Sequence, residues 1–366
     1  MQSAVARQNF IDWMKAIGML LIVAGHVIGD PNAAFNQLSL PANTKQLGVA
    51  FFVFISGWGL ANVSKATWYT VYKRIFSLFA YGIAFAVFFS VMFYYLYGTL
   101  QLSNYTPFVF GANVLFNDFP ANSTTWYIGT YLHLVLLWFC VTRHLHVRIS
   151  TLCVAFILEN VVRGTLISAD MSFIAYMLFP NWLSVFLLGH YLCNKADETS
   201  LNIAIITGVV WVLIAAAWSA AMRMFTIEGS LPFNHIILGD TWTVPLQSLL
   251  VSTIYLLSTW LFFQFTRRLP ANRVAQFFSR NTIVVFIIHL PVIYAFFPTW
   301  YRWLEGPLFE YRRVSLILMV YIVSAVISEL VTRLLRLERF REPLWLGFHK
   351  KIHGQLPTMP RDDDHR

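Results

Sequence analysis

The chain has 366 residues, of which 58% are apolar and only 12% are charged, and its mean hydropathy is +0.61. Soluble domains carry about a quarter charged residues, so this composition excludes an ordinary soluble domain and predicts an integral membrane protein. The net charge of +9 does not call for a nucleic-acid partner, because basic cytoplasmic loops give membrane proteins a positive balance.

Apolar runs separated by turn-rich or charged breaks follow one another along the chain. A membrane-spanning helix needs about 20 residues, and unpaired backbone groups are not tolerated in lipid, so these runs predict helices. The expected fold class is therefore all-α: a polytopic membrane protein of about ten transmembrane helices in residues 1–342, with a cytoplasmic tail at 343–366. The runs cover residues 11–29, 48–64, 76–97, 125–142, 150–162, 173–192, 201–220, 243–264, 281–298 and 314–334, of which the fifth is short.

Lysine and arginine set the expected orientation. If the N-terminus is cytoplasmic, 20 of the 26 Lys and Arg residues fall in cytoplasmic segments. Positive residues are concentrated on the cytoplasmic side of membrane proteins, so both termini are predicted to be cytoplasmic. The remaining six fall in outer segments: Lys45, Arg163, Arg223, Arg302, Arg312 and Arg313.

The first apolar run carries three ionisable residues, which are costly inside a membrane and therefore mark function. Asp12 and Lys15 are three residues apart and can pair on one helix face. Lys15 and His26 are eleven residues apart, which places them on a shared face about 16 Å apart along a helix. His26 is the candidate catalytic residue. Lys15 either belongs to the same site or extends its ammonium group to the membrane surface.

The second run contains Ser56, Gly57 and Gly59, and small residues of this kind allow neighbouring helices to approach closely. Lys73 and Arg74 form a basic pair where the third run opens. Such a pair fits either lipid head groups or a nucleotide phosphate.

The ninth run contains a second intramembrane histidine, His289, which is followed by the potential kink residue Pro291. Residue type alone leaves both a structural and a functional role open for this histidine. The cysteines lie in or beside apolar segments without metal-ligand spacing, so no metal site is predicted; they are Cys140, Cys153 and Cys193.

Five motifs, in order along the chain, resemble those of the acyltransferase family 3 membrane proteins. The family's first motif is a basic residue followed, after ten intervening residues, by a histidine, and it corresponds to Lys15 through His26. The family's Phe-rich Ser-Gly-aromatic element corresponds to Phe52 through Trp58. Its basic motif corresponds to Lys73-Arg74, its Trp-led fourth helix to Trp126-Tyr127-Ile128, and its late aliphatic-His-x-Pro element to Ile288 through Pro291. Together these motifs extend over nearly the whole chain.

Two positions depart from the pattern of many family members. Ser77 stands where a second arginine of the basic motif is common, and Tyr131 stands where the fourth helix often has a glutamate. The form without that glutamate resembles the branch that acts on exopolysaccharides and surface sugars. The resemblance thus implies transfer of an acetyl group from cytoplasmic acetyl-coenzyme A to a sugar hydroxyl, in a multi-pass protein of the inner (plasma) membrane.

The resemblance also implies roles for the polar residues. The acceptor would be a polysaccharide or a lipid-linked oligosaccharide. His26 would act either as general base or as transient acyl carrier. Asp12 would orient Lys15, so that the donor's pantetheine arm follows the Lys15–His26 face. The coenzyme A nucleotide would dock on Lys73, Arg74 and Arg148, and the pocket would include Ser56, Trp126, Tyr127 and His289.

Two other classes of function fit the same residues. A transporter or flippase for a glycan intermediate would use the buried Lys and His as a proton relay, and would move its substrate without covalent change. A non-catalytic subunit of a polysaccharide export complex would not need His26.

Overall fold

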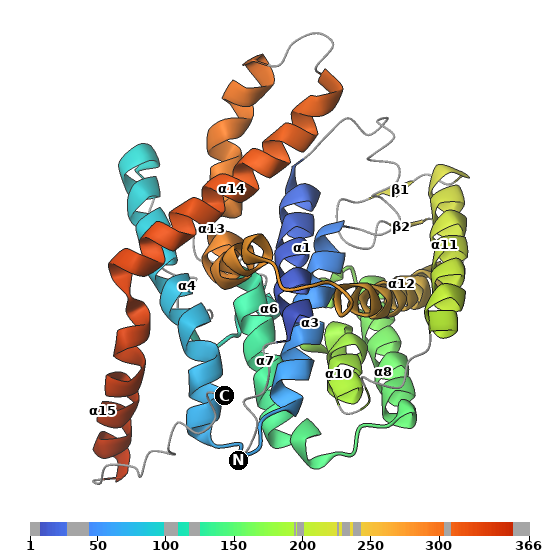
Figure 1. Ribbon diagram of the computed structural model, residues 1–366, viewed down its shortest axis with the longest axis horizontal. Coiled ribbons are helices and arrows are strands. Elements are labelled where there is room, and N and C mark those ends of the chain that lie inside the picture. The colour runs from blue at the N-terminus through green and yellow to red at the C-terminus, as the bar shows by residue number, and fades with distance from the viewer. Residues whose placement is uncertain are drawn as a thin grey trace.

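The computed structural model describes residues 8–27, 44–98, 109–116, 125–193, 195, 201–224, 227–228, 235–236, 243–303 and 309–353. These residues are almost entirely helical (Figure 1). The α-helices are α1 (Asn9–His26), α3 (Thr44–Ala61), α4 (Trp68–Tyr97), α6 (Asn113–Phe116), α7 (Trp126–Cys140), α8 (Ile149–Ser168), α9 (Ser172–Met177), α10 (Leu183–Cys193), α11 (Leu201–Met224), α12 (Thr243–Thr266), α13 (Arg273–Trp303), α14 (Phe309–Leu335) and α15 (Arg341–His353).

Short elements complete the described part of the chain. Three 3-10 helices, η2 (Thr142–His144), η3 (Phe179–Trp182) and η6 (Leu337–Phe340), connect longer helices. The strands β1 (Ile227–Glu228) and β2 (His235–Ile236) pair antiparallel, with Ile227 opposite Ile236. An all-α fold is therefore confirmed, apart from this pair of two-residue strands.

Each apolar run coincides with helical structure, but several runs differ in extent from the prediction, and three differences are informative. The short fifth run belongs to α8, which continues for 20 residues and includes Glu159 and Arg163. The sixth run is interrupted by η3, which has Pro180 near its start. Helix α13 begins eight residues before its run, at Arg273. The predicted runs stop at polar residues because hydropathy falls there. In the structure the helices continue through such residues, since neighbouring helices provide hydrogen-bond partners for the polar side chains.

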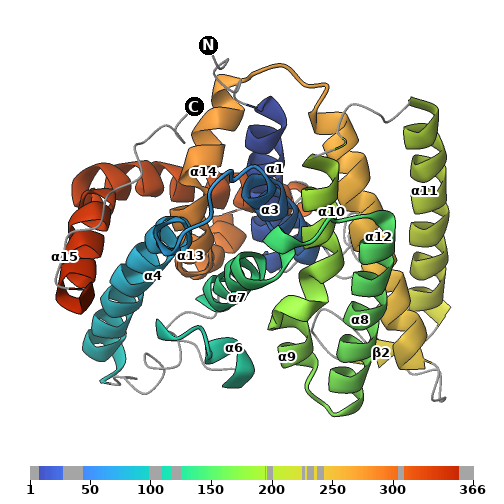
Figure 2. The same cartoon turned by 90° about the horizontal axis from the view of Figure 1, so that it is seen from below.

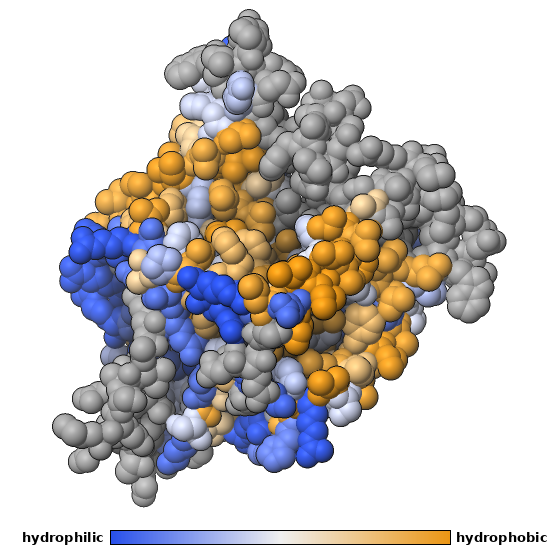
Figure 3. Space-filling model, turned by 45° about the vertical axis from the view of Figure 1, so that its right-hand side comes forward, coloured by the Kyte–Doolittle hydropathy of each residue, from blue (hydrophilic) through white to orange (hydrophobic). Residues whose placement is uncertain are grey.

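Five helical segments of the described chain are long and apolar enough to cross a membrane: Trp68–Leu96, Ile149–Ser168, Val244–Thr266, Arg273–Trp300 and Val314–Ile352. Two shorter apolar helices cover Gln46–Ala61 and Leu201–Ile214. The count of ten spans therefore stays a prediction. In Figure 3, apolar side chains gather over a broad area of one face, and hydrophilic side chains gather at its lower left.

Helix α8 has the polarity expected where lipid lies outside the protein. Its exposed side chains are apolar, as Val154, Ile157 and Val161 show. Glu159 and Arg163, in contrast, are both 0% exposed. Arg163 was expected in an outer segment beyond the end of the fifth run, and that end is wrong: the residue lies within α8, where Glu159, Asn181 and Ser248 accept hydrogen bonds from its guanidinium.

Helices α1 and α3 lie near the centre of the molecule, with α11 and α15 at opposite edges (Figures 1 and 2). Glycines allow the central helices to touch. A Cβ at Gly48 of α3 would overlap the carbonyl oxygen of Gly18 of α1, and one at Gly57 would overlap that of Phe186 of α10. The close approach expected around Gly57 is thus confirmed: it brings α3 against α10, as Gly48 brings α3 against α1.

The C-terminal segment returns to α4 through η6 and α15. Trp345 of α15 packs against Tyr69 and Tyr72 of α4, with ring centroids 5.5 and 5.2 Å away. The predicted domain boundary at residue 342 falls inside α15, and residues 354–366 of the predicted tail lie outside the described residues.

Candidate functional site

A cavity of about 170 Å³ lies among five helices and collects polar residues from each of them. Lys15 of α1, Ser56 of α3, Arg74 of α4 and Tyr127 of α7 all line it. The structure therefore brings together four of the residues that the sequence selected, although they are spread over more than a hundred positions. The remaining lining residues are Phe52, Ile55, Gly59, Leu60, Leu78, Tyr131, Thr282, Ile283 and Phe286.

Hydrogen bonds to the backbone position two of these side chains. Arg74 Nη2 donates to the carbonyl oxygen of Gly59 at 3.2 Å, which ties the guanidinium to the end of α3. Ser56 Oγ donates to the carbonyl of Phe52 at 2.7 Å, one turn earlier in the same helix. The guanidinium is thus held at the cavity wall, where its other N–H groups can donate to an anionic or carbonyl group.

A second cavity, of about 370 Å³, borders the first, because both are lined by Lys15, Thr282 and Ile283. Asp12 and Arg280 line the second cavity and not the first. Asp12 is 6% exposed, so its carboxylate lies within the protein. Lys15 therefore stands between two adjoining hollows with the acidic residue on one side, and its pairing with Asp12 stays a prediction.

The two intramembrane histidines are in contact. His26 Nδ1 lies 2.8 Å from the carbonyl oxygen of Ile22 and 3.2 Å from His289 Nε2. His289 is fully buried, and its Nδ1 lies 2.8 Å from the carbonyl oxygen of Phe286. The sequence placed these two residues 263 positions apart, and only the packing of α1 against α13 joins them.

The carbonyl partners determine where the protons sit on the two rings. A carbonyl oxygen only accepts, so Nδ1 of each histidine is the protonated nitrogen. In the neutral pair, His289 Nε2 then accepts a hydrogen bond from His26 Nδ1–H. The remaining nitrogen of His26, Nε2, carries a lone pair. This is the arrangement a general base needs, with its orientation fixed through the other ring nitrogen.

Aromatic contacts link the first cavity to the histidine pair. The rings of Tyr127 and Phe286 are 5.4 Å apart, and Phe286 and His289 follow at 6.0 Å. Thr282, Phe286 and His289 recur at four- and three-residue spacing, so they share one face of α13. The first cavity and the histidine pair are thus neighbours, with the Phe286 ring between them.

Besides the two histidines, three predicted site residues line neither cavity. Trp126 packs against Tyr176 at 4.7 Å between ring centroids. Lys73 is half-buried beside Arg74, and Arg148 is exposed directly before α8. The structure therefore separates these three from the cavity-lining set, and it provides no contact that tests a role in donor binding.

Sequence reasoning missed several lining residues. Tyr131 was noted only as a departure from the family pattern, yet it lines the first cavity one turn after Tyr127. Thr282 and Phe286 lie seven and three residues before His289, and this helical spacing was a signal that pointed to them. Arg280 gave no signal, because it precedes the apolar run. Within the described chain, no group of three His, Cys, Asp or Glu residues is placed to hold a metal ion.

Comparisons with known proteins bear on the same region. A family model described as an acyltransferase domain matches residues 8–333, which include both histidines and every residue that lines the two cavities. No curated protein and no solved structure matches the chain.

Proposed function

Because the chain belongs to acyltransferase family 3, we propose that it transfers an acetyl group from cytoplasmic acetyl-coenzyme A to a sugar hydroxyl of an exopolysaccharide or another surface glycan. The contact between His26 Nδ1 and His289 Nε2 is the observation that carries this proposal. It supplies an oriented base at the end of a cavity that also holds two cations, Lys15 and Arg74.

The reaction uses Nε2 of His26 as the proton acceptor. The acceptor hydroxyl attacks the thioester carbon while His26 Nε2 removes its proton. The ester C–O bond forms, the C–S bond breaks, and the proton passes from His26 to the departing sulfur of coenzyme A. His289 stabilises the imidazolium by accepting the hydrogen bond from Nδ1–H, and the Ile22 carbonyl holds the ring in place.

The same nitrogen serves if His26 carries the acetyl group transiently. Nε2 would then attack the thioester first, and the acceptor hydroxyl would attack the resulting acyl-imidazole. Incubation with radiolabelled donor in the absence of acceptor distinguishes the two routes, because only the carrier route leaves label on the protein.

The donor enters from the cytoplasmic ends of α1 and α13 in this proposal. Lys15 and Arg74 line the first cavity, where their charges attract the anionic donor. About 16 Å of helix separates Lys15 from His26. An extended, narrow pantetheine arm suits this distance better than a compact substrate does.

The acceptor side follows from the proposed orientation. With about ten spans in the inner membrane and both termini cytoplasmic, His26 at the end of α1 lies towards the outer face. A polysaccharide or lipid-linked oligosaccharide outside the cell would then meet the acetyl group there, and the bilayer itself is the protein's other partner.

The direct test replaces His26 with Ala or Asn in the full-length protein in lipid vesicles, and measures transfer of labelled acetyl groups to the glycan. Loss of a general base lowers the rate about 10²- to 10⁴-fold. Normal transfer at equal protein levels would exclude His26 from the reaction.

One observation favours the alternative class, a glycan transporter. The α9–η3–α10 segment is an interrupted helix, and many transporters bind substrates at such interruptions. In this protein, however, the carboxylate of Glu159 already accepts a hydrogen bond from the backbone of Ser184 at the start of α10. Glycan movement without incorporation of labelled acetyl groups would support the transporter instead.

A further inference from the structure

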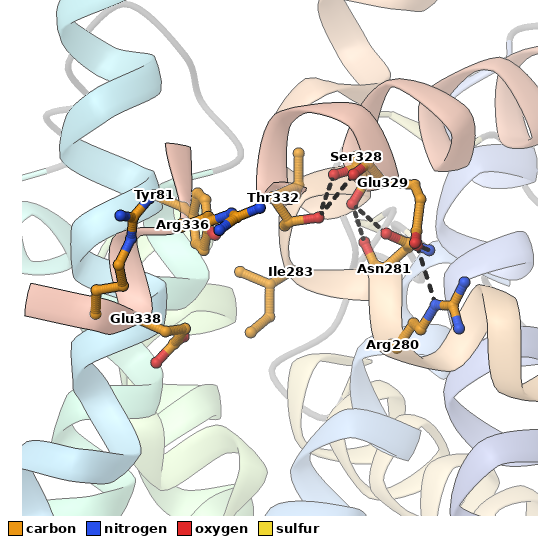
Figure 4. Close-up of a pocket in the computed structure, with 11 residues that line it drawn as sticks. Tyr81, Arg280, Asn281, Ile283, Ser328, Glu329, Thr332, Arg336 and Glu338 are labelled. Carbon is orange, nitrogen blue, oxygen red and sulfur yellow. Dashed lines mark hydrogen bonds and ion pairs between the residues drawn. The ribbon is translucent and has the colours of Figure 1, made fainter. Parts of the chain in front are cut away.

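A third cavity, of about 520 Å³, opens between α4, α13, α14 and η6. Figure 4 shows its two walls: Tyr81, Arg336 and Glu338 on one side, and Asn281, Ser328 and Glu329 on the other, with Ile283 between them. Arg280 and Arg339 also line it. Its basic residues belong to the segments predicted to be cytoplasmic, and neither the sequence motifs nor the proposed reaction accounts for it.

Both carboxylates in the cavity are engaged by neighbouring residues. Glu329 accepts hydrogen bonds from Arg280 at 3.0 Å, from Asn281 at 3.0 Å and from Arg333 at 2.9 Å. Glu338 accepts from Arg341 at 3.2 Å and from Ser77. These carboxylates are therefore already neutralised, and their contacts hold the walls in place.

The remaining arginines leave the cavity with an excess of positive charge. Arg336 Nε donates to the carbonyl oxygen of Arg333 at 3.0 Å. Among the described residues, no carboxylate lies within ion-pairing distance of Arg336 or Arg339. Two guanidinium groups that face one hollow without carboxylate partners are suited to bind an anion with several oxygens, above all a phosphate.

The backbone at Arg336 shapes the cavity. Its φ of 44° and ψ of 43° lie in the left-handed region, which a residue with a Cβ rarely adopts. This conformation ends α14 and turns the chain into η6, which forms a wall of the cavity.

The third cavity adjoins the proposed reaction site. It shares Arg280 with the cavity that contains Asp12, and Ile283 with both inner cavities. A ligand bound at Arg336 and Arg339 therefore sits at the entrance of a series of adjoining hollows that leads past Lys15 towards the histidine pair.

We infer that this cavity binds the phosphate groups of the acyl-coenzyme A nucleotide, while the pantetheine arm extends past Lys15. The inference rests on the proposed function and refines it, because it assigns the nucleotide to Arg336 and Arg339 of the C-terminal segment. Asn281, Ser328 and Thr332 line the same hollow and shape its wall through hydrogen bonds to one another and to Glu329. A phospholipid head group has the same phosphate chemistry, and the experiment separates the two sources.

The experiment uses the full-length protein in nanodiscs of neutral phosphatidylcholine. Binding of coenzyme A, of dephospho-coenzyme A and of pantetheine is measured for the wild type, R336Q, R339Q and the double variant. Loss of a charge-assisted contact should weaken coenzyme A binding about tenfold or more, while pantetheine binding stays unchanged. R336K keeps the positive charge but lacks the bidentate guanidinium, so its affinity for coenzyme A should lie between those of the wild type and R336Q.

The matched control is R273Q. Arg273 is an exposed arginine on α13, two turns before Arg280, and it lines none of the three cavities. This variant should bind coenzyme A as the wild type does. Thermal unfolding of each variant in the same nanodiscs shows whether it is folded.

Three results would overturn the inference. If folded R336Q/R339Q binds coenzyme A as tightly as a wild type that transfers acetyl groups, the nucleotide lies elsewhere and the proposed function still stands. Thermal unfolding is also measured in nanodiscs that contain anionic phosphatidylglycerol. If the double variant loses only the extra thermal stability that this lipid gives the wild type, and binds coenzyme A normally, the ligand is a lipid head group. A wild type that neither binds coenzyme A nor transfers acetyl groups would remove the proposed function together with this inference.

Discussion

At the scale of single residues, His289 has the clearest assigned role. It touches His26 through Nε2 and is fixed through Nδ1 to the Phe286 carbonyl, so in the proposed reaction it acts only through His26. It is therefore a positioning residue. Its full burial and its two backbone contacts explain why a polar ring is tolerated at this depth.

Replacing His289 with Leu should lower kcat about tenfold or more, with little change in KM for the acyl donor, because the acceptor that orients His26 is lost. Gln at this position retains an acceptor oxygen and should restore part of the rate. The measurement is initial-rate kinetics in vesicles over a range of donor concentrations. A rise in KM with unchanged kcat would show that His289 contacts the donor instead.

At the scale of elements, the crossing of α1 and α3 depends on glycine. Gly48 to Ala should force the two helices apart, destabilise the protein by about 1–3 kcal/mol and displace His26. Gly164 to Ala is the matched control, since nothing lies within 4 Å of the added Cβ. Thermal unfolding and acetyl transfer measured on both variants test this. An equal loss of thermal stability and of acetyl transfer in the two variants would mean that the contact between α1 and α3 is not the cause of the loss.

The interrupted helix between α9 and α10 is closed by residues of α8. Glu159 accepts a hydrogen bond from the Ser184 amide at 3.1 Å, and Arg163 Nη2 donates to the Asn181 carbonyl at 2.9 Å. The two side chains also pair with each other at 2.6 Å. Free backbone groups at a helix break are costly in a membrane, and this ion pair satisfies them.

Glu159 to Leu should destabilise the protein by about 3–5 kcal/mol, because Arg163 would remain buried without its carboxylate. The double change of Glu159 and Arg163 to Leu should be less harmful than the sum of the single changes. Val161 to Leu, on the exposed face of α8, is the control. Thermal unfolding in detergent compares the stabilities of these variants with that of the wild type. An E159L protein as stable as the wild type would show that the ion pair does not stabilise the helix break.

At the scale of the whole molecule, the open question is how many helices cross the membrane. The charge distribution predicts cytoplasmic termini, so a fluorescent protein fused after Arg366 should fluoresce and a periplasmic phosphatase at the same site should be inactive. Fusions after each helix would count the spans. A phosphatase active at the C-terminus would mean an odd number of spans or an inverted orientation.

The sequence alone determined the membrane class, the helical runs and the residues of the first helix, because hydropathy and the cost of buried charge are local properties. The same reasoning misplaced Arg163, since a charged residue was taken as the end of a run. Whether a charge is buried depends on its partners, and those of Arg163 come from η3 and α12 as well as its own helix.

Only the tertiary structure decided which of the selected residues meet. It joined His26 to His289, placed Lys15, Ser56, Arg74 and Tyr127 around one cavity, and left Trp126 and Arg148 outside it. It also revealed the hollow at Arg336 and Arg339, which no spacing in the sequence marks. The physical reason is that periodicity fixes which face of a helix a residue occupies, whereas helix packing fixes which other helix that face meets.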